Sequence, residues 1–542
     1  MNIINLRDIV LKQGGSRSLT RAFAHASFPL ALCFVLFLAA AGDAQEPLSV
    51  YDAAKTQAVT SVKIAPDGKH IAYVLSVIRD PWAGDDGKPY AELHVVDRAG
   101  NTRPFVAGPV NVDSVEWTPD GQGISFLAKR GDDEHTSLYV IPIDGGEARK
   151  LVKLKSSISG YSWRGDGKQI AVLAKAPQDR EKKELEEKGF AAEIYEEDLE
   201  STQVWLCDAD ESTKDEPTPF KLNGSASEVV YSPNGKQLAL ALAPTPLVDD
   251  NFMYRRIHIV DAESGTLVRK LENPGKVANI LWSPDGKRLA FCSGEDINDP
   301  SDDRLMVADL NDGSFGEVMK EYLPNISDIA WLNNDSLAFV AEDGCLAALG
   351  TVQTNGQDRK LLIEPGTPIF TTMSRSDDGA IAFAASTASH PDDVFVYADG
   401  QLNRLTNSNP WLKERSLGKQ EVVRYKATDG EFVEGVLIYP VDHKPGQRYP
   451  LILTVHGGPE SRIPNGWNTQ YKYPGQVAAG RGYAVFYPNY RGSTGRGVAF
   501  AKAHQGDYGG REFDDLIDGV DHLVEMGLVD EKKVGVTGSS YG

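Results

Sequence analysis

An alternation of apolar and polar positions recurs through the middle of the chain, from about residue 60 to 410. In each copy an apolar or aromatic residue precedes a turn of the type S-P-D-G-K, and an alternating apolar segment follows it. The alternation predicts half-buried strands. The Pro-Asp-Gly or Pro-Asn-Gly sequence supplies the fixed φ and then the positive φ that a tight reversal needs, so each copy predicts a β-hairpin. The Asp or Asn positions of the copies are Asp67, Asp120, Asp166, Asn234, Asp285, Asp335 and Asp378.

The spacing of these turns predicts a repeat architecture. Successive Asp or Asn positions are 53, 46, 68, 51, 50 and 43 residues apart. Periods near 40–50 residues with several strands each are typical of β-propeller blades. The copies therefore predict a β-propeller of about seven blades over residues 45–412. Because one blade cannot bury both of its faces, we expect the core to form between blades.

The 68-residue spacing contains an insertion. Residues 178–200 are charge-dense and favour a helix, and they include Glu196 and Glu197 near their end. Such a run of charges is usually a solvated helix or loop, here on the propeller rim. The alternative is an anionic anchor for the free amino terminus of a peptide.

The pattern changes after Leu412. Two alternating segments predict the antiparallel start of a sheet, and three mostly continuous apolar runs are typical of buried parallel strands. Apolar positions recur at helical spacing from Arg511 to Met526, before the last run. This order predicts an α/β-hydrolase sheet, so we interpret residues 413–542 as the N-terminal part of such a domain, which is then incomplete. The predicted strands are residues 421–426, 433–439, 451–455, 484–487 and 534–537.

Residues 538–542 read G-S-S-Y-G, a G-x-S-x-G motif that directly follows a predicted strand. This is the context of a nucleophile elbow, in which small flanking residues allow a strained turn that lifts the central hydroxyl clear of the sheet. Ser540 is therefore the candidate nucleophile. In α/β-hydrolases the acid and the His follow the Ser in the chain. We expect both beyond Gly542, and we expect the 542-residue chain to be inactive alone.

A second glycine-rich turn, His456-Gly457-Gly458-Pro459, ends the third predicted strand. Such a turn can present a backbone N–H to the substrate carbonyl above the nucleophile, and the N–H of Tyr541 can supply the other half of an oxyanion hole. His456 precedes the Ser, so we expect it to shape the turn through a ring hydrogen bond rather than to act as the base.

Two other polar segments are predicted to be structural. The sequence N-Y-R-G-S follows the fourth predicted strand, and we expect a contact from Arg491 to a carboxylate to fix this loop. Asp507, Asp514 and Asp515 precede the elbow and are interpreted as helix-start and structural acids.

The first 44 residues predict a secretory signal peptide. A leader with four Lys or Arg residues precedes an apolar run of 14 residues, 28–41, and small residues with A-x-A-like cleavage sites follow. The run is short for a membrane span, which needs about 20 residues. We therefore expect a secreted or periplasmic protein without a stable membrane span after cleavage; the alternative is a protein anchored by an uncleaved signal.

Charge and cysteine content exclude some classes of protein. The net charge of −21, from 56 basic and 77 acidic residues, argues against binding to nucleic acid. Beyond the leader, Cys207, Cys292 and Cys345 lie too far apart to form a disulfide framework, so we expect buried thiols. We expect no metal and no cofactor.

The leader, the repeated turns and the motifs HGGP, NYRGS, GDYGG and GSSYG together resemble the prolyl oligopeptidase family. The bacterial branch of acylaminoacyl peptidases and dipeptidyl peptidases fits best, over nearly the whole chain after residue 45. The resemblance implies a serine peptidase that cleaves short peptides through an acyl-enzyme at Ser540. It also implies oxyanion donors at Gly458 and Tyr541 and a propeller that excludes folded proteins.

The resemblance also bears on Glu196 and Glu197. Dipeptidyl-type members bind the amino terminus of the substrate with a Glu pair from a propeller segment, and these two residues are similar in local sequence. Other branches place a tyrosine hydroxyl in the oxyanion turn; His456 stands there in this chain, so that role is not expected.

Two alternatives stay open. An esterase acting on small acyl substrates would use the same chemistry, although a propeller favours a peptidase. A non-catalytic protein whose propeller rim docks a partner would need neither the acid nor the His. The preference for prolyl, acylated or free-amino substrates and the oligomeric state also stay open.

Overall fold

The computed structural model describes residues 45–152, 154–192, 196–197, 199–209 and 217–542. The predicted signal peptide, residues 1–44, lies outside the described residues. Contacts divide the chain into the units Met1–Gln45 and Glu46–Gly542, and the following description concerns the second unit. No helix among the described residues combines the length and the apolarity that crossing a membrane requires.

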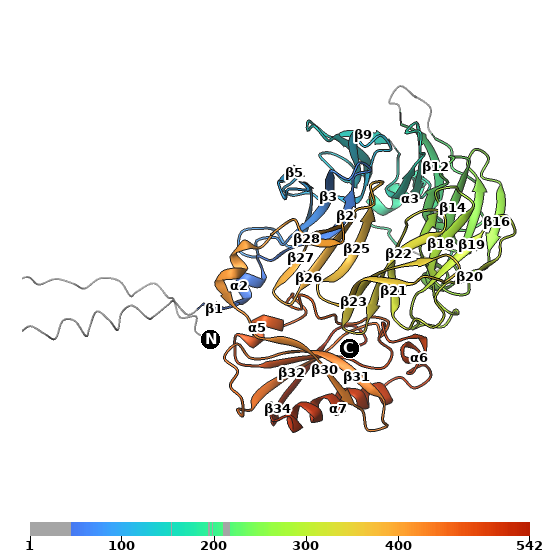
Figure 1. Cartoon of the computed structure of the whole chain (residues 1–542). Helices are drawn as coiled ribbons and strands as arrows, with labels where there is room; N and C mark the ends of the chain where they lie inside the picture. The colour runs from blue at the N-terminus through green and yellow to red at the C-terminus, as the bar shows by residue number, and fades with distance from the viewer. Residues whose placement is uncertain (1–44, 153, 193–195, 198, 210–216) are drawn as a thin grey trace, which may run out of the picture. The chain divides into compact units, whose positions relative to one another are not determined.

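Seven antiparallel sheets follow one another along the described part of the chain, each built from strands consecutive in sequence (Figure 1). Six of them have four strands, and the third has three. This arrangement confirms the predicted propeller of about seven blades.

The strands of the first three blades are β2 (Gln57–Ile64), β3 (His70–Val77), β4 (Tyr90–Asp97) and β5 (Thr102–Val106); β6 (Asp113–Trp117), β7 (Gly123–Ala128), β8 (Ser137–Pro142) and β9 (Arg149–Val152); and β10 (Ile158–Trp163), β11 (Gln169–Ala174) and β12 (Gln203–Asp208). Those of the fourth and fifth are β13 (Ser225–Tyr231), β14 (Gln237–Ala243), β15 (Arg256–Asp261) and β16 (Leu267–Leu271); and β17 (Val277–Trp282), β18 (Arg288–Ser293), β19 (Arg304–Asp309) and β20 (Phe315–Glu317). Those of the last two are β21 (Asn325–Trp331), β22 (Ser336–Asp343), β23 (Leu346–Gln353) and β24 (Lys360–Gly366); and β25 (Ile369–Arg375), β26 (Ile381–Thr387), β27 (His390–Ala398) and β28 (Gln401–Arg404).

The S-P-D-G-K turns connect the first and second strands of the blades, as predicted. In the fifth blade Ser283 Oγ donates to Asp285 Oδ1 at 2.8 Å, and the Lys287 N–H donates to the same oxygen at 3.1 Å. Gly286 between them has a φ of +69°, which a side chain would strain. Local side-chain hydrogen bonds and one glycine therefore close this hairpin, whereas the corresponding turn of the sixth blade, residues 332–335, contains no glycine.

The aromatic residue before the turn joins its blade to the preceding blade. In three blades a Trp indole N–H donates to a backbone carbonyl of the neighbouring first strand, which satisfies the polar end of a buried ring. Hydrophobic clusters fill the space between blades, as expected for a propeller. The three indole bonds are Trp117 to Lys63 O (2.8 Å), Trp282 to Val230 O (3.1 Å) and Trp331 to Leu281 O (3.1 Å).

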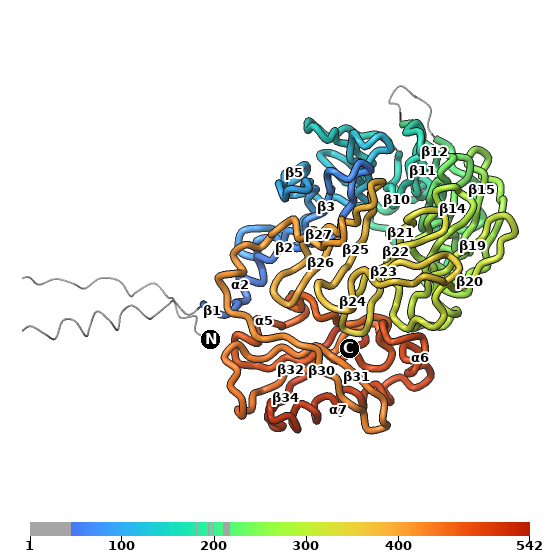
Figure 2. Tube along the Cα trace, in the orientation of Figure 1, coloured from blue at the N-terminus to red at the C-terminus, as the bar shows by residue number. Residues whose placement is uncertain are grey.

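The first and seventh blades close the ring without a shared strand in the described structure (Figure 2). Apolar side chains of β2 and β3 pack against those of β26 and β27. Beside this cluster the buried Asn409 side chain donates to Gln57 O at 2.7 Å and accepts from Gln57 N–H at 2.9 Å. The amide thus takes the place of one peptide group of a neighbouring strand.

The connections between second and third strands lie on the side of the propeller that contacts the hydrolase sheet. In the fifth blade this connection includes Asp302, which accepts the N–H groups of Gly495 and Gly497 at 3.1 and 2.8 Å. In the sixth blade it includes Cys345, whose carbonyl accepts from Asn465 N–H at 2.7 Å. Because the blades follow one pattern, the equivalent connections of the other blades lie on the same side.

The chain enters and leaves the propeller at one place. Strand β1 (Glu46–Pro47) pairs in parallel with β29 (Arg415–Ser416), after the 3-10 helix η1 (Pro410–Glu414). Asp52, in the short helix α2 (Val50–Ala53), accepts from Arg415 Nε at 3.0 Å. Burial alone would raise the pKa of Asp52, but this contact and the hydrogen bonds from Ser49 outweigh it and lower the pKa to about 2.

The hydrolase region is a five-stranded sheet of order β30-β31-β33-β32-β34. The pairs β30–β31 and β31–β33 are antiparallel, and β32 is parallel to both β33 and β34. The amphipathic helix α7 packs Leu523 and its neighbours on one face. The five predicted strands and the predicted helix are confirmed. Their bounds are β30 (Gln420–Lys426), β31 (Phe432–Ile438), β32 (Tyr449–Val455), β33 (Ala484–Asn489), β34 (Val529–Gly538), α5 (Gly475–Ala479), α6 (Val498–Ala501) and α7 (Arg511–Glu525).

Candidate active site

Ser540 lies on the turn that follows β34. Its φ is +58°, a left-handed conformation that residues other than glycine rarely adopt. The residue is exposed, and the preceding strand, β34, pairs in parallel with β32 at the end of the strand order. A strained, exposed serine at the end of a parallel strand is the geometry of a nucleophile elbow.

The HGGP turn lies against this elbow. Because β32 and β34 are parallel and Val455 pairs with Gly538, the turns that follow them leave the sheet at the same edge. A Cβ on Gly457 would lie 2.7 Å from Ser539 O and 2.9 Å from Ser540 Cβ. The structure therefore brings together the two segments that carry the predicted oxyanion donors, Gly458 and Tyr541.

His456 is buried below the turn and holds it. Its Nδ1 lies 2.8 Å from Gly457 O, and its Nε2 lies 2.9 Å from Ser493 Oγ. The Ser493 hydroxyl donates its single proton to Tyr490 O at 2.6 Å, so the His456 ring, Ser493 and two backbone carbonyls form one buried network. Burial lowers the pKa of His456 to about 4, so the ring is neutral near pH 7. Both ring nitrogens are thus engaged, in agreement with the predicted structural role.

Arg491 fixes the NYRGS loop, as predicted. Its Nη2 lies 2.6 Å from Asp515 Oδ1 and its Nη1 lies 2.7 Å from Asp429 Oδ2. The hydrogen bond from Arg491 lowers the pKa of Asp429 to about 2. Asp507 accepts from Arg511 N–H at 3.3 Å at the start of α7, and Asp514 lies in its first turn.

Sequence reasoning missed two buried residues beside the elbow, Glu512 and His504. Glu512 Oε1 accepts from the Tyr541 hydroxyl at 2.7 Å. The ring of His504 is fully buried, with its centroid 6.0 Å from that of Tyr541. The acidic residue in the first turn of a predicted helix, shortly after GDYGG, was the only available signal for Glu512, and it equally fits a helix-start acid.

Glu196 and Glu197 are exposed residues on the connection between β11 and β12. This connection contains helix α3 (Arg180–Glu187), as the charge-dense segment predicted, and it lies on the hydrolase side of the propeller. Among the described residues, no hydrogen bond or ion pair joins either Glu to the elbow.

A cavity of about 380 Å³ lies between the propeller and the hydrolase sheet, next to the HGGP turn. Glu460, Ser461 and Arg462, which follow Pro459, line one side. Lys276 of the propeller forms an ion pair with Glu460 at this interface. The propeller residues of the lining are Asp303, Asn325, Ser327, Glu342, Ile369, Phe370 and Thr371.

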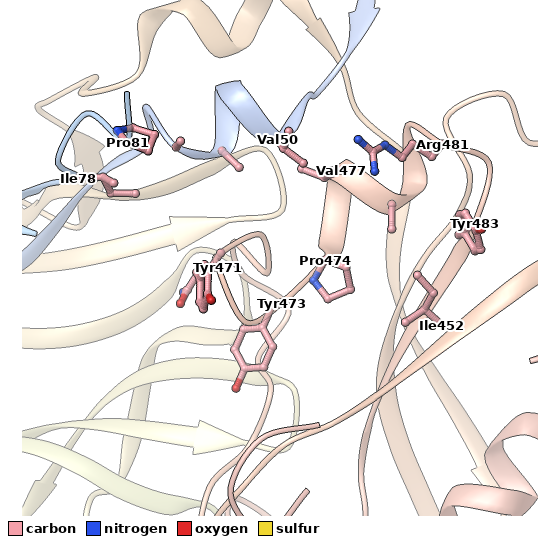
Figure 3. Close-up of a pocket in the computed structure, with 14 residues that line it drawn as sticks. Val50, Ile78, Pro81, Ile452, Tyr471, Tyr473, Pro474, Val477, Arg481 and Tyr483 are labelled. Atoms are coloured by element: carbon pink, nitrogen blue, oxygen red, sulfur yellow. The ribbon is translucent and has the colours of Figure 1, made fainter. Parts of the chain in front are cut away.

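A separate, more apolar pocket of about 630 Å³ is shown in Figure 3. Val50 of α2, Ile78, Tyr471 and Val477 are among its lining residues, and none of them belongs to the elbow or to the HGGP turn. It is therefore not part of the candidate site. Across the described residues, no group of three or more His, Cys, Asp or Glu side chains is arranged to hold a metal ion.

Comparisons with known proteins agree with this geometry. Residues 469–542 match the family described as the prolyl oligopeptidase family. An uncharacterised peptidase of Bacillus subtilis, YuxL, is 28% identical over 89% of this chain and 77% of its own length. Dipeptidyl-peptidase 5 of Porphyromonas endodontalis is 24% identical over 88% of this chain and 72% of its own length. The solved acylaminoacyl peptidase of Pyrococcus horikoshii shares the fold, with a TM-score of 0.72 and 19% identity over 92% of this chain and 75% of that chain.

A propeller that precedes a hydrolase sheet with a serine elbow, together with these relatives, defines the class of the chain as a serine peptidase. Its C-terminal segment, residues 469–542, matches the prolyl oligopeptidase family, and nearly the whole of the described chain is similar to known peptidases.

Proposed function

We propose that Ser540 is the nucleophile of a peptidase that cleaves short peptides through an acyl-enzyme. The observation that carries this proposal is the strained φ of an exposed Ser540 on a turn packed against the HGGP turn. Strain of this kind persists where the surrounding structure imposes it, and it is concentrated at functional sites.

The proposed reaction follows from the two turns. Ser540 Oγ attacks the peptide carbonyl while a base removes its proton, and the N–H groups of Gly458 and Tyr541 stabilise the oxyanion. The leaving amine departs with a proton, and water then hydrolyses the ester. In this fold the base and its acid follow the nucleophile in the chain. We therefore assign both roles to residues that follow Ser540 in the chain.

The position of the cavity supports short peptides as substrates. It lies between the propeller and the hydrolase sheet, so a substrate has to fit beneath the blades. Two relatives are a dipeptidyl peptidase and an acylaminoacyl peptidase, which suggests an exopeptidase that acts on free-amino or acylated termini. For the free-amino case we propose that Glu196 and Glu197 bind the protonated terminus, because they lie on the hydrolase side of the propeller.

A fluorophosphonate probe, which labels activated serines, tests the nucleophile in the natural full-length protein. We expect Ser540→Ala to abolish both labelling and peptide hydrolysis without changing the melting temperature by more than a few degrees. Ser539→Ala is the matched control and should keep both activities. Loss of labelling in Ser539→Ala but not in Ser540→Ala would show that the motif register is wrong.

We also propose export through the N-terminal leader, to the periplasm or the outside of the cell, with an uncleaved membrane anchor as the alternative. The pattern of residues 1–44 supports this proposal. The mass of the protein recovered from the exported fraction tests it, because cleavage after Ala41 or Ala44 removes the leader, whereas an anchored protein keeps it and sediments with membranes.

A further inference from the structure

We propose that Glu512 is a positioning residue for the oxyanion hole and that it acts through the hydroxyl of Tyr541. The inference rests on the proposed function, because it requires Ser540 to be the nucleophile and the Tyr541 N–H to be a donor.

The contacts of Glu512 tie the elbow to helix α7. Glu512 Oε1 accepts from the Tyr541 hydroxyl at 2.7 Å and from the Gly509 N–H at 2.6 Å. The residue lies in the first turn of α7 and is only 3% exposed. The partial positive charge of a helix N-terminus stabilises a carboxylate in this position. One oxygen of a fixed, buried acid therefore holds the ring of the residue that follows the nucleophile.

Neighbouring rings restrict the same side chain from other directions. The centroids of His504 and Tyr508 lie 6.0 and 6.1 Å from that of Tyr541, both in edge-to-face orientation. Gly492 allows the close approach of His504, because a Cβ there would lie 2.9 Å from Nδ1. His504, Tyr508 and Glu512 thus contact one side of the Tyr541 ring, and the other side is partly exposed.

The hydrogen bond keeps its direction over the working pH range. Burial and the neighbouring carboxylate of Glu512 raise the pKa of Tyr541 to about 12, so the phenol remains a donor. A bond with an ionised acceptor is roughly twice as strong as one between neutral groups. The side chain of Tyr541 and its own backbone N–H move together, so a fixed phenol limits the directions in which that N–H can point.

The burial of the Glu512 carboxylate costs free energy that a purely structural role does not explain. Its second oxygen, Oε2, is buried without a hydrogen-bond partner among the described residues. Such an arrangement costs free energy that a neutral acceptor would avoid. Small displacements of a catalytic donor cause large losses of rate. A carboxylate at this position is therefore explained if it holds the oxyanion turn in place.

Four variants of the natural full-length protein test the proposal: Glu512→Ala, Glu512→Gln, Tyr541→Phe and the double variant Glu512→Ala/Tyr541→Phe. We expect the two deletions of the bond, Glu512→Ala and Tyr541→Phe, each to lower kcat about tenfold, with KM changed less than about twofold. Glu512→Gln keeps an acceptor oxygen without the charge and should lose about two- to threefold. The double variant should be no more than about twofold slower than the slower single variant, because both remove the same bond.

A peptidyl boronic acid, which mimics the tetrahedral intermediate, gives a second measurement. Its affinity should fall by the same factor as kcat/KM in Glu512→Ala, and Glu525→Ala at the exposed end of α7 should change neither. Additive losses in the double variant, or a lowered melting temperature with unchanged kcat and boronate affinity, would overturn the positioning role. Failure of the proposed function would be distinct, since Ser540→Ala would then still react with the fluorophosphonate probe.

Discussion

At Gly457 a single methyl group would overlap the elbow. The nearest atoms are Ser539 O and Ser540 Cβ, and neither is the end of a flexible side chain that could move away. Any side chain at this position must therefore displace the turn that carries the nucleophile.

We predict that Gly457→Ala lowers stability by about 1–3 kcal/mol through overpacking and slows fluorophosphonate labelling of the full-length protein at least tenfold, because it shifts Ser540. Gly316→Ala is the matched control, since a Cβ there meets no atom within 4 Å and no positive φ is involved. Thermal melting and the labelling rate measure both effects. A variant that labels at the wild-type rate would contradict the close contact between the two turns.

At the scale of elements, the connection between β33 and α7 reaches from the propeller to the elbow. Its backbone N–H groups at Gly495 and Gly497 bind Asp302 of the fifth blade. Lys502, further along, forms an ion pair with Asp296 of the same blade. The connection then supplies His504 and leads to Glu512. A single segment therefore contacts both the propeller and the residue that holds Tyr541.

Asp302 makes the stability of this contact pH-dependent. Burial raises its pKa from 3.8 to about 6, and the negative charge of Glu342 also raises it. The hydrogen bonds from the N–H groups of Gly495 and Gly497 and the positive charge of Arg304 lower it by less. Between pH 4 and 6 the native state holds a proton that the unfolded state has lost. The contribution of Asp302 to stability is thus greatest below pH 4 and is lost as the pH rises through 6.

We predict that the stability of Asp302→Asn relative to wild type increases by up to about 3 kcal/mol between pH 4 and 7, because the amide does not titrate. Denaturant melts at several pH values measure this difference. The difference is the useful quantity because His456, with its lowered pKa, changes wild-type stability in the opposite direction over the same range. A difference that stays constant with pH would show that Asp302 is ionised throughout.

Elements with local causes were predictable from the sequence. The hairpin turns depend on residues at most five positions apart, such as Ser283 and Arg288, and the apolar runs of the hydrolase sheet required no knowledge of their neighbours. The elbow was predictable because strand, glycine and serine are adjacent. Glu512 and Asp302 were not, because their partners lie 29 and about 195 positions away. Nothing in the local sequence distinguishes them from surface acids.

At the scale of the whole molecule, the propeller directs one set of connections at the hydrolase sheet. The insertion with Glu196 and Glu197 belongs to this set, between the second and third strands of its blade. If Glu196 and Glu197 bind the amino terminus of the substrate, the bound peptide spans the distance between this insertion and the elbow. Two charge-assisted hydrogen bonds to an ammonium group would contribute about 1.5–3 kcal/mol each.

We predict that replacing Glu196 and Glu197 together with Gln in the full-length protein lowers kcat/KM for free-amino dipeptide substrates about tenfold or more, and leaves N-acylated substrates nearly unchanged. Glu186→Gln with Glu187→Gln, in helix α3 of the same insertion, is the matched control and should affect neither substrate. Equal kinetics of wild type and the Glu196/Glu197 variant on both substrates would indicate a solvated rim segment and would favour an acylaminoacyl peptidase or a general oligopeptidase.

The two hydrogen bonds between the Asn409 side chain and the Gln57 backbone, beside the contact of the first and seventh blades, have a consequence for biosynthesis. The two residues are 352 positions apart, whereas each other blade packs against a blade made shortly before it. At about 5–20 residues per second, a ribosome takes roughly 20 to 70 s to make the intervening chain. Throughout that interval the apolar outer face of the first blade, including Val59 and Ile64, has no native partner. The nascent protein must therefore be shielded from aggregation, by chaperones or by its own partly formed ring, until the seventh blade emerges.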